Sequence, residues 1–307
     1  MPYFNIVAET SENTVVTEYE PVKKRSDSYQ SEAELEQEFI RLLCEQGYEY
    51  LPIHTEKDLI ANLRKKLEEL NNYQFSDTEW DDFFKNAVAN PNEHIVEKTR
   101  KIQEDNVQVL TRDDGSSKNI TLIDKKNIHN NRLQVINQYK VNAFTENGAK
   151  HDNRYDVTVL VNGLPLVHIE LKRRGVAIRE AFNQINRYQR DSFWAGCGLY
   201  EYIQIFVISN GTNTKYYSNS TRRNAEKEHE KRGASKTKTS NSFEFTCFWA
   251  DANNRVIPDL IDFTKTVFAK HTILNILTKY CIFTSEDMLM VMRHYQITAT
   301  ERMLNRI

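Results

Sequence analysis

The sequence lacks four features that would place it in a common class. Its four cysteines (Cys44, Cys197, Cys247 and Cys281) include no CxxC pair, which argues against both a zinc site and a disulfide framework. No apolar run approaches the roughly 20 residues of a membrane-spanning helix, and the N-terminus lacks the basic-then-apolar form of a signal peptide. No GxxxxGKS/T phosphate-binding loop occurs, so an ATPase in its own right is excluded. These absences favour a cytoplasmic globular protein.

Strong positive charge is also missing. The 307 residues carry a net charge of −2, and 39% of them are hydrophobic, enough for one large or two modest domains. Binding to a phosphate backbone needs only local positive charge. The local candidates are Lys23-Lys24-Arg25, Lys125-Lys126 and Lys172-Arg173-Arg174, and a solvated surface is the alternative for each.

Two alternating segments flank Asn162-Gly163. In residues 157–161 and 167–171 apolar, mostly β-branched residues recur at every second position, which predicts a β-hairpin. A two-residue loop would set Val157 against His168 and spoil the apolar face. We therefore expect an odd loop centred on Gly163, at positive φ, which sets Val157 against Ile169.

This register brings Asp156 opposite Glu170, with Lys172 two residues along on the same face. Facing carboxylates repel unless a cation lies between them, and oxygen ligands suit Mg²⁺. A bound ion lowers the pKa of its water and stabilises charge on a phosphate, while Lys172 would orient that water. The pattern predicts a phosphodiester-hydrolysis site. A chance D…ExK pattern on a wet strand face is the alternative; His168, on that face, is expected to support the site from behind.

A helix is predicted over about residues 177–190, with Gln184 and Tyr188 four apart on one face. Together, Asp156, Glu170-Leu171-Lys172 and Gln184-x-x-x-Tyr188 resemble the PD-(D/E)xK nucleases of the RecB-like branch. Five stretches, in order, resemble the restriction (motor) subunit of type I restriction–modification enzymes, HsdR: SYQSEAELEQEF, TLIDKKN, NRYDVTVLVNGLPLVHIELKRRGVAIREAFNQINRY, FVISNGTNTKYY and MRHYQITATERML.

The resemblance implies an α/β, restriction-endonuclease-like fold: a mixed sheet flanked by helices, with an N-terminal helical elaboration. It implies Mg²⁺-dependent cleavage of double-stranded DNA without sequence specificity of its own, with Mn²⁺ as a substitute. Asp156, Glu170 and the main-chain carbonyl of Leu171 would hold the metal, and Gln184 and Tyr188 would orient the site or touch the DNA backbone. The implied partners are DNA and the methyltransferase and specificity subunits, in a bacterial cytoplasm.

The first predicted helix begins with the capping box Ser31-Glu-Ala-Glu34 and ends at Gly47. The resemblance implies that a glutamate of this helix helps to hold the metal. Glu36 is our choice and Glu32 the alternate, while a solvent-facing glutamate remains open. His129 is expected to be a surface histidine.

The remaining pattern predicts further elements. Helices are expected over residues 57–70, 77–89 and 259–280, and strands over residues 48–52, 107–111, 120–123, 202–209, 214–218, 243–249 and 288–292. Residues 221–241 are polar and charged with almost nothing apolar, which predicts a mobile loop.

The predicted division is an N-terminal segment (1–30), an endonuclease domain (31–280) and the start of a truncated superfamily 2 motor (281–307). Gln296 resembles the adenine-reading glutamine of such motors, although His294 stands where proline is usual, so ATP would serve only the full-length subunit. The alternative function is a catalytically silent DNA-binding module that docks the motor onto the methyltransferase core. The intact Asp156, Glu170 and Lys172 set argues against it.

Overall fold

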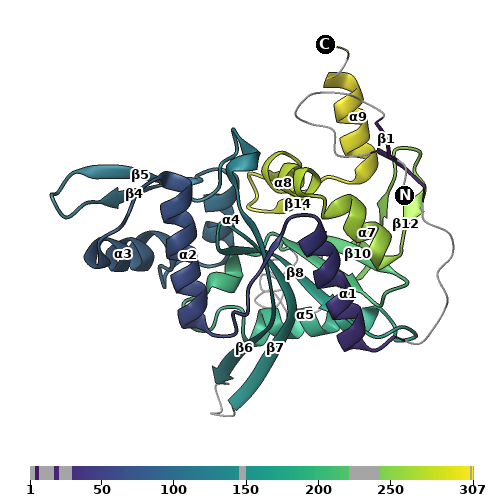
Figure 1. Ribbon diagram of the computed structural model, residues 1–307, viewed down its shortest axis with the longest axis horizontal. Coiled ribbons are helices and arrows are strands. Elements are labelled where there is room, and N and C mark those ends of the chain that lie inside the picture. The colour runs from purple at the N-terminus through teal and green to yellow at the C-terminus, as the bar shows by residue number, and fades with distance from the viewer. Residues whose placement is uncertain are drawn as a thin grey trace, which may run out of the picture.

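The computed structural model describes residues 4–6, 17–20, 30–144, 150–220, 243–304 and 306. Its centre is a six-stranded sheet with the strand order β10-β9-β8-β7-β6-β3 (Figure 1). The strands are β3 (Glu49–Tyr50), β6 (Leu133–Phe144), β7 (Lys150–Val161), β8 (Leu164–Leu171), β9 (Ile205–Ser209) and β10 (Thr214–Ser218). The β8–β9 and β3–β6 pairs are parallel and the others antiparallel. The expected mixed α/β sheet is confirmed.

The middle of the sheet is buried on both faces. Every residue of β8 and β9 is buried, as a central strand requires, although β8 carries His168 and Glu170 among its apolar residues. Burying a histidine and a carboxyl group costs free energy unless they are paired. Their presence in the core therefore makes β8 the candidate strand for a functional site.

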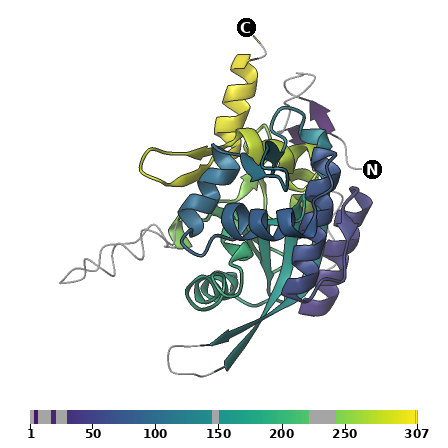
Figure 2. The same cartoon turned by 90° about the vertical axis from the view of Figure 1, so that its left-hand side faces the viewer.

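Helices cover both faces of the sheet. Figures 1 and 2 show α1 and α5 on opposite sides of it. The α-helices are α1 (Glu32–Glu45), α2 (Glu56–Asn71), α3 (Asp77–Phe83), α4 (Ile95–Gln103), α5 (Arg179–Asp191), α7 (Leu260–Val267), α8 (Lys270–Lys279) and α9 (His294–Leu304). The π-helix η1 (Phe84–Val88) continues α3, and η2 (Ile128–Asn130), η3 (Leu199–Tyr202) and η4 (Phe243–Phe245) are short 3₁₀ helices. The predicted capping box starts α1: Glu34 N donates to Ser31 Oγ (3.2 Å) and Ser31 N donates to Glu34 Oε2 (2.8 Å).

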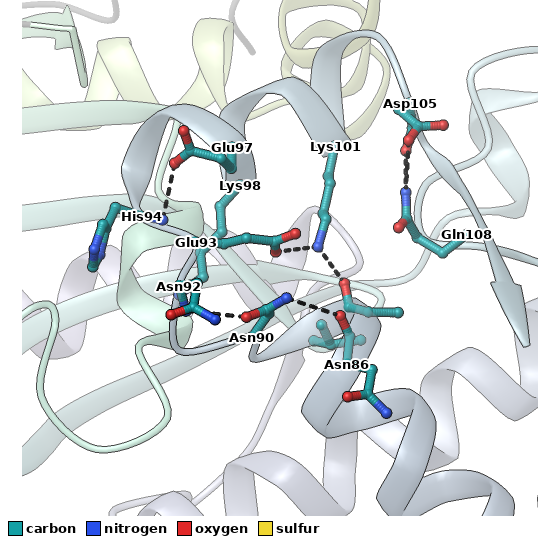
Figure 3. Close-up of polar contacts among 12 residues, drawn as sticks. Asn86, Asn90, Asn92, Glu93, His94, Glu97, Lys98, Lys101, Asp105 and Gln108 are labelled. Atoms are coloured by element: carbon teal, nitrogen blue, oxygen red, sulfur yellow. Dashed lines mark hydrogen bonds and ion pairs between the residues drawn. The ribbon is translucent and has the colours of Figure 1, made fainter.

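The helical elaboration comprises α2, α3 and α4 with the hairpin of β4 (Val107–Thr111) and β5 (Ser117–Thr121). The pattern missed α4 because its buried side includes Lys98 and Lys101 where apolar residues are expected. Lys98 Nζ donates to the Gly198 carbonyl (2.9 Å) and lies 3.0 Å from Glu201 Oε2, which joins the elaboration to the segment after α5. Lys101 turns to Glu93, as Figure 3 shows.

Two predicted elements are wrong. The helix expected over 259–280 is two helices, because the backbone leaves the helical conformation at Ala269 (φ −54°, ψ 131°). The buried Tyr48 hydroxyl donates a hydrogen bond to the Phe268 carbonyl (2.8 Å) at this break. The strand expected over 243–249 is instead the turn η4, a single bridge from Cys247 to Tyr216 and the start of β11.

Besides the β4–β5 hairpin, three two-stranded ladders among the described residues lie outside the main sheet. They are β1 (Phe4–Ile6) with β2 (Thr17–Tyr19), β11 (Trp249–Ala250) with β12 (Val256–Ile257), and β13 (Cys281–Phe283) with β14 (Leu289–Val291). Among the described residues, no helix has the length and apolar character to span a membrane. The basic run at 23–25 and the loop predicted over 221–241 lie outside the described residues, and the division at 280 stays a prediction.

Candidate active site

The β7–β8 hairpin has the predicted register, but its loop and strand pairing differ from the prediction. Val157 lies opposite Ile169, as expected. The loop nevertheless has two residues, Asn162 and Gly163, both with positive φ (51° and 85°). The expected odd loop is therefore wrong. A bulge between the Val159 and Leu160 pairs leaves Leu166 as the extra residue in β8 and restores the register.

The charged residues of the predicted triad converge where β7–β8 pairing ends. Asp156 Oδ2 accepts a hydrogen bond from Leu171 N (2.9 Å). Lys172 Nζ lies 3.2 Å from Glu170 Oε1 and donates to the Leu171 carbonyl (3.0 Å). Because Asp156 bonds the backbone next to Glu170, the hairpin gathers two carboxyl groups and one ammonium group at a single place.

Burial dominates the electrostatics of these two acids. It raises the pKa of Asp156 to about 7, with a further rise from the Glu170 charge, and burial likewise raises the pKa of Glu170 to about 7 against the opposing effect of Lys172. Both pKa values lie far above those of carboxyl groups in water. At neutral pH full ionisation of the pair therefore requires more positive charge than Lys172 supplies.

The donor set fits a hard cation in part. Glu170 Oε2 is buried and has no hydrogen-bond partner among the described residues, so it is free to bind an ion. The candidate ligands, two carboxylates and the Leu171 carbonyl, are all oxygen, as Mg²⁺ prefers. Yet no three histidine, cysteine or acidic side chains in the described ranges come together as a metal site. Two carboxylates, with water and phosphate oxygens completing the shell, are a usual Mg²⁺ set.

The helix α5 ties the tyrosine of its Gln-x-x-x-Tyr pair to β7. Gln184 Nε2 donates to the Tyr188 hydroxyl (2.5 Å), which donates to the Arg154 carbonyl (2.8 Å). Burial, and then the charge of Glu170, raises the pKa of Tyr188 well above its ordinary value, so the hydroxyl keeps its proton. The pair thus fixes the backbone of β7 two residues before Asp156.

Both candidate glutamates of α1 face the site. The buried Glu36 carboxylate accepts hydrogen bonds from Asn137 Nδ2 (2.6 Å) and from Gln138 Nε2. Burial raises its pKa, and the charge of Asp156 adds to the rise. Glu32 Oε1 accepts a bond from Arg173 N (3.3 Å), and its charge contributes to the raised pKa of Glu170.

Sequence reasoning missed Gln138. It has a left-handed backbone (φ 53°) in the middle of β6, and the ladder skips the pair it would make with Asp156. Such strain in a non-glycine residue costs of order 1–3 kcal/mol and concentrates at functional sites. The available signal was the Asn137-Gln138 pair, which interrupts an alternating apolar strand.

His168 lies behind the carboxylates. It is fully buried, with Nε2 3.5 Å from Glu170 Oε2 and Nδ1 3.4 Å from Thr158 Oγ1. Burial lowers its pKa to about 4, so the ring is neutral at pH 7 and does not replace the positive charge the acids need. It supports Glu170 from the core side, facing aromatic rings that include Tyr155 and Phe193.

The other predicted residues lie apart from this cluster. Lys125 donates to the Gln103 carbonyl (2.5 Å), His129 stacks on His271 (ring centroids 5.7 Å apart), and Gln296 Oε1 accepts from Arg293 N (2.8 Å) at the start of α9. Two cavities, of about 560 and 420 Å³, meet at Gly196 and are lined by none of the predicted site residues.

Comparison with known proteins places the chain in a family. The sequence model described as "Type I restriction enzyme R protein N terminus" matches residues 29–225. The type I restriction enzyme EcoprrI endonuclease subunit of Escherichia coli is 49% identical over 302 residues, covering 98% of this chain and 90% of that protein. The SsaAORF53P endonuclease subunit of Staphylococcus saprophyticus is 35% identical over 284 residues, 91% of this chain.

The SauMSSORF170P endonuclease subunit of Staphylococcus aureus strain MSSA476 is 34% identical over 285 residues, again 91% of this chain. The chain spans 27% of the length of each of these two staphylococcal relatives. The matched stretch includes α1, the β7–β8 hairpin and α5, the elements that build the site. The chain belongs to the family of N-terminal regions of type I restriction enzyme R proteins.

Proposed function

We propose that this chain is a Mg²⁺-dependent DNA endonuclease module that hydrolyses phosphodiester bonds of double-stranded DNA without sequence specificity of its own. One observation carries the proposal: Asp156 bonds the backbone beside Glu170, with Lys172 Nζ 3.2 Å from the Glu170 carboxylate. A buried acid pair of this kind has no use in a scaffold, because it destabilises the fold when ionised.

Each residue of the site has a proposed role that depends on its position. Asp156, Glu170 and the Leu171 carbonyl would hold the ion, which when bound supplies Lewis-acid stabilisation of charge on phosphate and a more acidic water. Lys172 would orient the attacking water or stabilise developing negative charge. Gln184 and Tyr188 position β7, and Glu36 holds the strained backbone of β6 at Gln138. Mn²⁺ is the expected substitute ion.

The proposal extends to the wider assembly. The relatives are named as endonuclease subunits of type I restriction enzymes. We propose that the chain acts in such a complex, with methyltransferase and specificity subunits, in the bacterial cytoplasm. ATP would serve the full-length subunit, with Gln296 at its adenine site.

A second function, a catalytically silent docking module, has one observation in its favour. Within the described ranges no three histidine, cysteine or acidic side chains are grouped so that they could hold a metal ion, and Lys172 already pairs with Glu170. The test is nicking of supercoiled plasmid with Mg²⁺ or Mn²⁺, wild type against Glu170→Ala. The nuclease proposal expects nicking by wild type alone, whereas equal products from both proteins would leave the docking function.

A further inference from the structure

The strands β6 and β7 run past the rest of the sheet as a two-stranded ribbon, which Figures 1 and 2 both show. The β6–β7 pairing extends to Phe144 opposite Lys150, whereas the β7–β8 pairing stops at Val157 opposite Ile169. The ribbon therefore passes the predicted site and continues beyond it.

Lys140 and Arg154 lie directly opposite each other on this ribbon, and both are exposed. The adjacent pair, Tyr139 and Tyr155, stacks with ring centroids 6.2 Å apart, and Tyr155 packs on Tyr188 of α5 (4.8 Å). Because side chains alternate along a strand, Lys140 and Arg154 project from the opposite face of the ribbon.

The arginine also belongs to the neighbourhood of the site. Its positive charge acts on Glu36, where it opposes the rise in pKa that burial causes. Arg154 precedes Asp156 by two residues, which at a rise of about 3.4 Å per residue places the two roughly 7 Å apart along β7. That is a step of one or two phosphates along a DNA strand.

Within the described residues neither Lys140 nor Arg154 makes a side-chain ion pair or hydrogen bond, and Glu36 acts on Arg154 only through its charge. The buried Lys98 and Lys101, by contrast, are each matched to a glutamate. Like charges directly opposite on a ladder destabilise it. A polyanion lying across both side chains would remove that repulsion.

We infer that Lys140 and Arg154 form a phosphate clamp that holds the DNA backbone next to the scissile bond. The inference rests on the proposed function and deepens it by naming residues that position the substrate. The clamp contacts phosphate and not bases, so it is indifferent to DNA sequence.

The test is binding of a short fluorescent DNA duplex by anisotropy at several salt concentrations, with EDTA to prevent cleavage. Each lost phosphate contact lowers the slope of log K against log salt by about 0.9. We expect Lys140→Gln and Arg154→Gln each to reduce the slope by that amount, and the double variant by about 1.8. The matched control, Lys85→Gln/Arg132→Gln, removes one exposed lysine and one exposed arginine elsewhere and keeps the wild-type slope.

Folding is checked by thermal melting, where the double variant should melt no lower than wild type because the cross-strand repulsion is gone. A wild-type slope in the double variant, an equal fall in the control, or no binding by wild type would each overturn the clamp. Failure of the nuclease proposal looks different: nicking by Glu170→Ala equals that by wild type, whatever the salt slopes are.

Discussion

Removing the charge of Glu170 should stabilise the metal-free protein at high pH. Folding raises the pKa of this carboxyl from 4.5 to about 7. Between those values the folded protein keeps a proton that the unfolded chain releases, so the free energy of unfolding falls as pH rises. At 1.36 kcal/mol per pKa unit the full cost is about 3 kcal/mol well above pH 7, and most of it develops between pH 5 and pH 8.

The assay is urea unfolding at pH 5 and pH 8 in EDTA, for wild type, Glu170→Gln and the exposed control Glu180→Gln. The stability of Glu170→Gln relative to wild type should rise by about 2–3 kcal/mol between the two pH values. The control difference should not change, since Glu180 is exposed. Mg²⁺ at pH 8 should raise the free energy of unfolding of the wild-type protein and leave that of Glu170→Gln unchanged.

A refutation would be a difference between Glu170→Gln and wild type that does not depend on pH. That result would mean that the Glu170 carboxyl ionises in the fold as it does in water. Asp156 and Glu170 would then need no bound cation at neutral pH, although the fold would stand.

Three further perturbations test the structure around the site. Gly163→Ala should destabilise by about 1–3 kcal/mol, since the residue has positive φ and a Cβ would lie 2.6 Å from Leu63 Cα, and a urea melt that matches wild type would contradict this. Tyr188→Phe should cost about 1 kcal/mol of stability by losing its bond to the Arg154 carbonyl, and should slow plasmid nicking more than it weakens DNA binding. Lys98→Met should cost about 3–5 kcal/mol because it removes the ammonium group 3.0 Å from the buried Glu201 carboxylate, and a melting temperature near that of wild type would count against the ion pair.

The sequence predicted the hairpin register because only one register keeps its apolar face intact. That constraint fixed Val157 opposite Ile169, although the turn and bulge that achieve it were not foreseen. A two-residue loop followed by a bulge and a three-residue loop without a bulge give the same register, so the apolar pattern alone does not distinguish them. The placement of Asp156 near Glu170 depends on register and not on loop length, and it was therefore predictable.

The features that the apolar pattern did not predict lie mostly where polar side chains are buried. The helix α4 buries Lys98 and Lys101, and Gln138 breaks β6 with a left-handed backbone; in each case tertiary hydrogen bonds outweigh local preference. The break at Ala269 was hidden because apolar periodicity continues across it. Local rules fail here because the compensating partners, such as Glu201 for Lys98, lie far away in the chain.

The most direct measurement is calorimetric titration of Mn²⁺ into the wild-type protein and into Asp156→Ala, Glu170→Ala and Glu180→Ala variants at pH 8. Wild type and Glu180→Ala should bind the ion with the same affinity, and the two site variants should lose that binding. Equal affinity in all four proteins would contradict the claim that Asp156 and Glu170 hold a divalent ion between them.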